Sequence, residues 1–230
     1  MCDLLEFKHT FTCIVAGTTG SGKTSFCIKL LRDLDTLCTE SRFGGGIIWW
    51  YSEETAVPRQ QLDKLGLNIT YQDGLPENYG NVHGEQSFII LDDLLNQVYS
   101  KDVCDFFTKG SHHRNISVLL LTQNLFHQST NCRDISLKAK YLVLLKNDRD
   151  KNQFLYLARQ VYPEDSRSLY DAYRDATPQP HGYLILDFAQ DTDDTVRFRT
   201  NVFPDEGPHI VYAPANDEKH KIQLLQVTHP

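Results

Sequence analysis

The chain has 230 residues and a formal net charge of −7, and 40% of its residues are hydrophobic. This length fits one large domain with a substantial core, and a charged fraction of 23% is ordinary for a globular protein. The acidic balance argues against a generally basic nucleic-acid coat protein, and no apolar run approaches the roughly 18 residues that a membrane span needs.

The sequence has no feature that directs the protein out of the cell. Its first residues lack the basic, apolar and small-residue segments of a signal peptide. Its six cysteines are widely spread and form no CxxC pair, so neither a zinc ribbon nor a disulfide framework is predicted. We therefore expect an intracellular protein with reduced thiols and no membrane association.

The basic residues gather in one part of the chain. Residues 109–174 carry eleven Lys or Arg and six Asp or Glu, a local net charge of +5 in a protein of −7. A locally basic surface suits a channel that faces DNA. A solvated face with charges of both signs would have the same composition, and the sequence leaves both interpretations open.

In chain order, apolar β-branched runs alternate with helical patterns, which predicts a parallel sheet covered by helices. The predicted strands are residues 11–16, 47–51, 68–71, 88–91, 116–122, 141–145, 183–188 and 196–200. The predicted helices are residues 23–37, 58–65, 94–108, 150–161 and 164–175. The end of the chain is polar and contains proline, so we expect one domain over residues 1–203 and a polar tail or extended arm over residues 204–230.

The first predicted strand runs directly into a segment that matches the phosphate-binding pattern GxxxxGK[ST], and an amphipathic helix begins at its lysine. The segment consists of Gly17, Thr18, Thr19, Gly20, Ser21, Gly22, Lys23 and Thr24. Its glycines let consecutive N–H groups face a β-phosphate, and the helix N-terminus adds its positive dipole. Lys23 is expected to reach the β- and γ-phosphate oxygens, and the Thr24 hydroxyl to bind Mg²⁺. The segment therefore predicts a P-loop that binds ATP and Mg²⁺.

Two adjacent carboxylates, Asp92 and Asp93, follow the apolar strand predicted at residues 88–91. Ligands of open α/β sheets bind at the carboxyl ends of the strands, which is where these side chains should lie. We expect Asp92 to hold Mg²⁺, usually through water, and Asp93 to polarise the attacking water as a general base. The alternative is that one of the two acids only caps the following helix.

The strand predicted at residues 116–122 ends at Gln123 and Asn124. An amide at the tip of the strand beside the acidic one can sense a γ-phosphate or orient water, although either residue could instead cap the next segment. The functional interpretation implies that another strand separates the P-loop strand from the acidic strand. The predicted fold class is thus α/β: a RecA-like P-loop NTPase three-layer sandwich with a mostly parallel central sheet.

Together these elements resemble the FtsK/HerA group of ring-forming DNA translocases. Within that group, the chain is most similar to the genome-packaging ATPases of large DNA viruses and of Maverick/Polinton-type virus-like elements. The resemblance spans about residues 10–200 and rests on residues 17–24, 89–93, 114–124 and 145–153. The last two blocks are much more specific to the group than the P-loop is.

The chain departs from the pattern of this group at two places. Many relatives place Glu after the Mg²⁺ aspartate, where this chain has Asp93, whose shorter side chain would act through a water. Relatives also often carry an arginine at the start of the helix-to-strand turn, where this chain has Gly-Ser-His-His before Arg114. Arg114 is the nearest equivalent.

A ring mechanism requires an arginine from a neighbouring subunit to stabilise charge on the γ-phosphate. The candidates are Arg114 and Arg149, which both lie in the blocks that carry the resemblance. Each of them could instead form a surface ion pair or contact the DNA backbone.

The resemblance implies an ATP-hydrolysing, homo-oligomeric ring that translocates double-stranded DNA and packages a viral genome through a capsid portal vertex. Such a motor would work in the nucleus or cytoplasm of a host cell, at sites of virus assembly. Two other functions share the P-loop: a nucleoside or nucleotide kinase, and an ATP-gated scaffold that assembles without hydrolysis. The acidic pair and the separate amide at Gln123 argue against the kinase, and intact Lys23, Thr24 and Asp92 argue against the scaffold.

Overall fold

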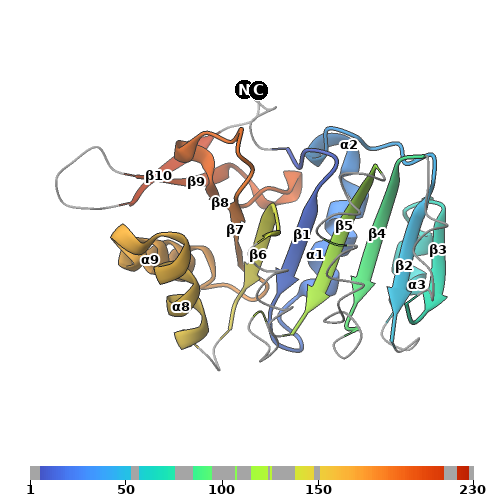
Figure 1. The fold of residues 1–230 in the computed structure, drawn as a ribbon, viewed down its shortest axis with the longest axis horizontal. Helices are drawn as coiled ribbons and strands as arrows, with labels where there is room; N and C mark the ends of the chain where they lie inside the picture. The colour runs from blue at the N-terminus through green and yellow to red at the C-terminus, as the bar shows by residue number, and fades with distance from the viewer. Residues whose placement is uncertain are drawn as a thin grey trace.

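The computed structural model describes residues 6–52, 57–75, 85–94, 107, 115–123, 125, 138–147, 151–214 and 222–227. Within these ranges ten strands form one sheet, in the order β10-β9-β8-β7-β6-β1-β5-β4-β2-β3 (Figure 1). Their bounds are β1 (Thr12–Ala16), β2 (Ile47–Tyr51), β3 (Ile69–Asp73), β4 (Ser87–Asp92), β5 (Ile116–Thr122), β6 (Tyr141–Leu145), β7 (Tyr183–Asp187), β8 (Phe198–Thr200), β9 (His209–Pro214) and β10 (Ile222–Val227).

The six strands from β6 to β3 are parallel to one another. Every residue of β1, β4, β5 and β6 is buried, as expected for apolar runs covered on both faces. β5 pairs with β1 on one side and with β4 on the other. The predicted strand between the P-loop strand and the acidic strand is therefore present, and it is β5.

The remaining strands, β7 to β10, continue the sheet in antiparallel pairs. Residues 204–230, expected to form a polar tail or extended arm, contribute the 3₁₀ helix η7 (Pro204–Glu206) and both β9 and β10. Val211, Tyr212 and Ala213 of β9 are buried. This short apolar run lies among polar residues, and pairing with β8 places it in the sheet.

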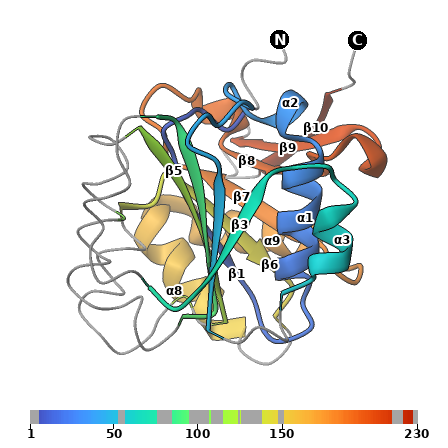
Figure 2. The same ribbon diagram turned by 90° about the vertical axis from the view of Figure 1, so that its right-hand side faces the viewer.

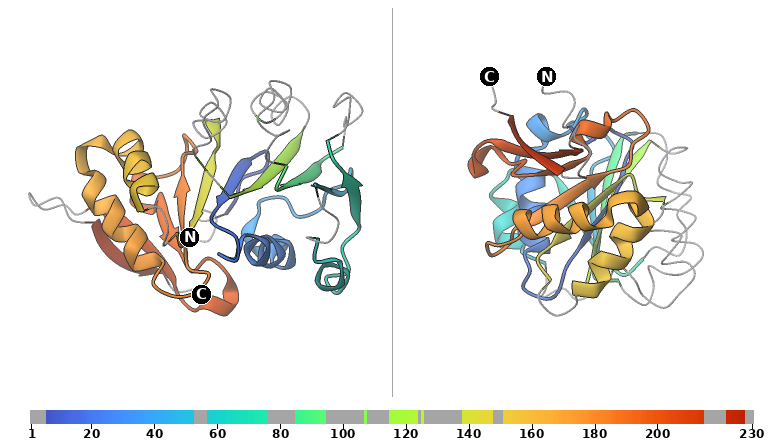
Figure 3. Two further views of the ribbon diagram at one scale, coloured as in Figure 1. Left: turned by 90° about the horizontal axis from the view of Figure 1, so that it is seen from below. Right: turned by 90° about the vertical axis from the view of Figure 1, so that its left-hand side faces the viewer.

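Helices cover both faces of the sheet, which confirms the three-layer arrangement (Figures 2 and 3). One face carries α1 (Lys23–Arg32), α2 (Leu34–Leu37) and α3 (Arg59–Asp63), and the other carries α8 (Lys151–Val161) and α9 (Ser166–Ala176). Alternate residues of β1 enter the two cores: Ile14 packs on the α8 and α9 side, and Cys13 and Val15 pack on the α1 side. Among the described residues, no helix is both long enough and apolar enough to span a membrane.

The helix predicted at residues 23–37 is divided at Asp33 into α1 and α2. Asp33 has φ −108° and ψ 25°, and its carboxylate accepts two hydrogen bonds from Arg32, at 2.9 and 2.6 Å. The apolar residues that predicted one helix are nevertheless buried on both sides of this break. The predicted helix at residues 94–108 lies outside the described residues, except for its first residue and residue 107.

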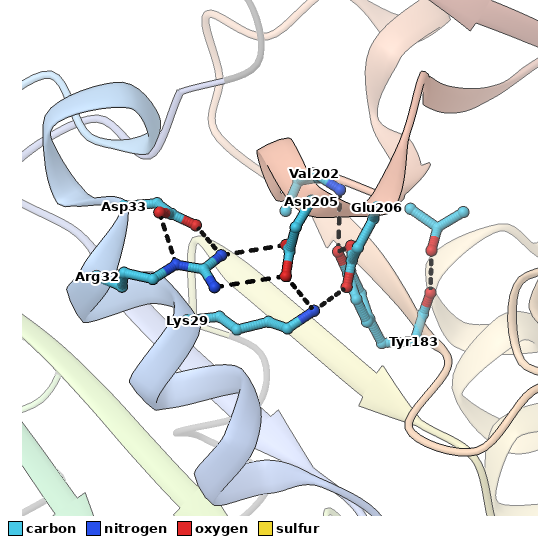
Figure 4. Close-up of polar contacts among 8 residues, drawn as sticks. Lys29, Arg32, Asp33, Tyr183, Val202, Asp205 and Glu206 are labelled. Carbon is cyan, nitrogen blue, oxygen red and sulfur yellow. Dashed lines mark hydrogen bonds and ion pairs between the residues drawn. The ribbon is translucent and has the colours of Figure 1, made fainter. Parts of the chain in front are cut away.

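A polar cluster joins the end of α1 to the antiparallel half of the sheet (Figure 4). Lys29 Nζ lies 2.9 Å from Glu206 Oε1, and Arg32 Nη2 lies 3.1 Å from Asp205 Oδ1. The Tyr183 hydroxyl donates to Glu206 Oε2 at 2.5 Å and accepts from the Val202 N–H at 2.9 Å. The helix that follows the P-loop is thus bonded to the segment that leads into β9.

Candidate active site

The P-loop begins where β1 ends, at the same edge of the sheet as the ends of β4 and β5. The Gly17 N–H donates to the Thr122 carbonyl at 3.1 Å, which joins the start of the loop to the end of β5. The Ser21 N–H donates to the Thr18 carbonyl at 3.1 Å, so the chain turns back on itself before α1. This turn places the loop at the carboxyl edge, where ligands of open α/β sheets bind.

Glycine is required at two positions of the loop for steric reasons. A Cβ on Gly17 would lie 2.4 Å from Ser21 Oγ and 2.9 Å from Leu145 Cβ. Gly22 has φ 107°, and a Cβ there would lie 2.4 Å from His181 Nδ1. The two glycines therefore let other parts of the chain approach the loop closely.

The Lys23 ammonium lies inside the curl of the loop. Its Nζ donates to the carbonyls of Gly17 and Thr18, at 2.7 and 3.1 Å. Burial lowers the pKa of Lys23, and the nearby charges of Asp93 and Asp92 act in the opposite direction. The loop thus surrounds a cation, as a site for the phosphates of a nucleotide requires.

Asp92, the last residue of β4, is buried and accepts a hydrogen bond from Trp49 Nε1 at 3.2 Å. Burial, together with the charge of the neighbouring Asp93, raises the pKa of Asp92 to about 6, although the hydrogen bond from Trp49 and the charge of Lys23 act in the opposite direction. Sequence reasoning missed Trp49, although a buried indole N–H generally has an acceptor. Trp49 orients the carboxylate that we expected to hold a metal ion.

Asp93 has an unusual backbone conformation, with φ 50° in a residue other than glycine. Its N–H donates to the Leu121 carbonyl at 3.3 Å, and its carbonyl accepts from the Ser52 hydroxyl at 3.1 Å. Its Oδ2 accepts from Gln123 Nε2 at 2.8 Å. Its Oδ1 is buried and has no hydrogen-bond partner among the described residues. One oxygen of this carboxylate is therefore held, and the other can accept a proton or a hydrogen bond.

Gln123 connects the P-loop to Asp93. The Thr19 hydroxyl donates to Gln123 Oε1 at 3.3 Å, and the amide nitrogen of Gln123 donates to Asp93. The three side chains come from the loop, from the end of β5 and from the end of β4. The structure thus brings together Asp93 and Gln123, the acid and the amide that the sequence analysis predicted at the site, because β5 lies between β1 and β4.

Two of the described side chains are candidate oxygen ligands for a small cation. The described residues contain no group of three or more His, Cys, Asp or Glu side chains that could hold a metal ion. Mg²⁺ at nucleotide sites usually needs only one or two protein oxygens, together with phosphate oxygens and water. Asp92 and the half-buried Thr24, at the start of α1, would supply these oxygens. Arg114, Asn124 and Arg149 lie outside the described residues.

Comparisons with known proteins agree with this architecture. No protein-family model and no curated protein sequence matches the chain. Among solved structures, the chain is similar to B204, the DNA-packaging ATPase from Sulfolobus Turreted Icosahedral Virus, with TM-score 0.50 and 12% identity over 79% of this chain and 94% of that one. It is also similar to the genome packaging NTPase B204 from Sulfolobus turreted icosahedral virus 2 in complex with AMP, with TM-score 0.51 and 12% identity over 83% of this chain and 96% of that one.

The chain has the P-loop NTPase fold. The additional strand β5 makes it RecA-like, as predicted, and the sheet is mostly parallel around the loop. At 12% identity, the similarity to these structures supports a shared fold only. The side chains at the carboxyl edge of this P-loop NTPase sheet determine which chemistry the site can perform.

Proposed function

We propose that the chain is an ATPase that hydrolyses ATP at the P-loop with Mg²⁺. The hydrogen-bonded series Thr19–Gln123–Asp93 carries this proposal, because it links a phosphate-binding loop to a carboxylate beside it. Asp93 Oδ1 would take a proton from the attacking water, while Gln123 holds Oδ2 and fixes the plane of the carboxylate. Lys23 and the loop N–H groups would stabilise charge on the phosphates. Mg²⁺, held by Asp92 and Thr24, would neutralise charge on the β- and γ-phosphates.

We further propose that the ATPase is a homo-oligomeric ring that moves double-stranded DNA into a viral capsid through its portal vertex. The blocks at residues 114–124 and 145–153 support this proposal, as does the fold shared with B204, which is described as a DNA-packaging ATPase. The excess of basic residues between 109 and 174 would contact DNA phosphates without reading bases. Arg114 or Arg149 would enter the site of the neighbouring subunit. The ring would work inside a host cell, where virus particles assemble.

The experiment that tests the ATPase compares wild type with Lys23→Ala. We expect Mg²⁺-dependent phosphate release from wild type and a loss of at least about 100-fold in the variant, since the ammonium stabilises charge in the transition state. Equal turnover by the two proteins would contradict hydrolysis at this site and favour the assembly scaffold.

The experiment that tests the motor adds long duplex DNA, short duplex DNA or nucleosides to the wild-type assay. We expect long duplex DNA to raise the rate and to promote oligomers in the presence of ATP. Transfer of phosphate to a nucleoside, without stimulation by DNA, would indicate a kinase. A protein that stays monomeric with ATP and DNA would contradict the ring.

A further inference from the structure

Among the described residues, the carboxylates and the amide suited to hydrolysis lie on one side of the P-loop strand. Asp92 ends β4, Asp93 follows it, and Gln123 follows β5, whereas β6 pairs with β1 on the opposite side. A triphosphate bound in the loop would therefore direct its terminal phosphate toward the β4 and β5 side. The nucleoside at its other end would leave the loop away from these strands, toward the β6 side.

Residues 177–182, which connect α9 to β7, occupy this β6 side. β7 is antiparallel to β6, and Tyr183 pairs with Leu145, so the connection lies at the same edge of the sheet as the P-loop. The Lys146 N–H donates to the Gly182 carbonyl at 3.1 Å, and Lys146 Nζ donates to the Pro178 carbonyl at 3.2 Å. These bonds hold the connection against the residues that follow β6.

His181 extends from this connection to the P-loop. Its Nδ1 lies 3.2 Å from the Ser21 carbonyl oxygen, 160 residues away in sequence. Because a carbonyl oxygen only accepts hydrogen bonds, this contact assigns the proton to Nδ1 and leaves Nε2 of a neutral ring as an acceptor. His181 is exposed to solvent and has φ 64°, a left-handed conformation that is uncommon outside glycine.

His181 lies so close to the P-loop that residue 22 has no room for a side chain. A side chain at residue 22 would collide with His181, because a Cβ there would lie 2.4 Å from Nδ1. Gly22 therefore serves two purposes: its φ of 107° turns the chain into α1, and its missing side chain admits the imidazole. A planar, exposed ring is thus placed beside the start of the helix that binds phosphate.

We propose that His181 lines the nucleoside end of the nucleotide site, where its ring stacks on the base and Nε2 accepts a hydrogen bond from a ribose hydroxyl. The inference rests on the proposed function, because it assumes that the P-loop binds a nucleoside triphosphate. Residues 177–182 would thus recognise the nucleoside, which is the part of ATP that inorganic phosphates lack.

The test compares the affinities of ATP and inorganic tripolyphosphate, both with Mg²⁺, for wild type and three variants. His181→Ala should weaken ATP binding about 5- to 50-fold, in line with the loss of one base-stacking contact, and should leave tripolyphosphate binding unchanged. His181→Phe keeps a planar ring and should recover part of the ATP affinity. Gln179→Ala, an exposed residue of the same connection, is the matched control and should change neither affinity.

Four results would overturn the inference. Equal weakening of both ligands by His181→Ala would mean that His181 only supports the P-loop through the Ser21 carbonyl. No change in either affinity would mean that the ring does not meet the ligand. If wild type binds neither ligand, the proposed nucleotide site itself is refuted. If it binds tripolyphosphate but not ATP, only the proposed nucleoside end is refuted. Thermal unfolding of each variant verifies that the fold is intact.

Discussion

At the scale of single residues, the buried carboxylate of Asp92 lowers the stability of the folded protein. Its carboxylate is buried, and its pKa is raised to about 6 from an ordinary value of 3.8. A carboxyl group with a raised pKa in the folded state lowers stability as pH rises, because the unfolded state ionises more easily. Burying this charge, at the proposed Mg²⁺ site, therefore reduces the free energy of unfolding at neutral pH.

Asp92→Asn should stabilise the protein and abolish ATP hydrolysis. The stabilisation should be small near pH 4, about 0.5 kcal/mol, because folded Asp92 is protonated there while unfolded Asp92 is about half ionised, and it should reach about 1–3 kcal/mol above pH 6. Urea unfolding at pH 4 and pH 7.5, without nucleotide or Mg²⁺, measures the effect. The control is Asp73→Asn, an exposed residue at the end of β3, which should change neither stability nor activity. Lower stability of Asp92→Asn at pH 7.5 would contradict the argument.

Gln123→Glu should shift the pH dependence of hydrolysis. In wild type, Gln123 Nε2 lies 2.8 Å from Asp93 Oδ2. The substitution replaces this amide with a second carboxylate next to that of Asp93. Two carboxylates this close raise the pKa of one of them, so the acidic limb of the pH–rate profile should move to higher pH by about one unit or more. The exposed Gln61→Glu on α3 is the control. A Gln123→Glu profile that superimposes on that of wild type would show that Gln123 does not act on Asp93.

At the scale of elements, ion pairs and hydrogen bonds connect α1 to the antiparallel half of the sheet, and some of them are exposed while others are buried. The pair between Arg32 and Asp205 is exposed, with side chains 41% and 47% accessible, so it should contribute little. The Tyr183 hydroxyl is buried and satisfies both the Val202 N–H and Glu206 (Figure 4). The stability of this junction should therefore depend on Tyr183 more than on the ion pairs around it.

Tyr183→Phe should lower the free energy of unfolding by about 1–3 kcal/mol, because it leaves the buried Val202 N–H without its acceptor. Tyr156→Phe makes the same chemical change at a tyrosine that is 66% exposed, and it should have an effect within about 0.5 kcal/mol. Urea unfolding of both variants provides the comparison. Equal effects of the two substitutions would show that the Tyr183 bonds contribute nothing net.

At the scale of the whole molecule, one continuous sheet joins the parallel strands around the P-loop to the antiparallel strands at its other end. β6 and β7 form the junction, and both cores contain residues from each half. In the antiparallel half, Asp187 and Arg199 form an ion pair at 2.9 Å, with side chains 2% and 0% accessible. Nε and Nη2 of Arg199 have no hydrogen-bond partner among the described residues. The guanidinium therefore depends strongly on Asp187.

Asp187→Asn should destabilise the whole protein by about 3–5 kcal/mol, because it leaves a buried guanidinium without its counter-ion. Trp49 and Trp50 lie in β2, in the parallel half, and are the protein's two tryptophans. If the sheet unfolds as one unit, tryptophan fluorescence and far-UV circular dichroism should report the same lowered midpoint. Asp194→Asn, whose pair with Arg197 is exposed, is the control. A fluorescence midpoint unaffected by Asp187→Asn would show that the two halves unfold separately.

Much of the fold and part of the site follow from local sequence patterns. The P-loop depends on the spacing of Gly17, Gly22 and Lys23 within eight residues, so the sequence alone predicted it. The strands that carry Asp92 and Gln123 are apolar runs, and their ends place these side chains at one edge. The strands after residue 203 were missed, because a few buried residues in a polar segment give a weak periodic signal.

Only the tertiary structure decided how these residues meet. Thr19 and Gln123 are 104 residues apart, and Ser21 and His181 are 160 apart, so their contacts depend on the strand order and on where each connection returns to the sheet. The bond from Trp49 to Asp92 likewise requires β2 to pair with β4. A pattern of a few residues specifies local conformation, and therefore the sequence by itself determined the phosphate loop. The hydrogen-bond partners of the acids come from segments that are distant in sequence, and only the folded sheet brings those segments together.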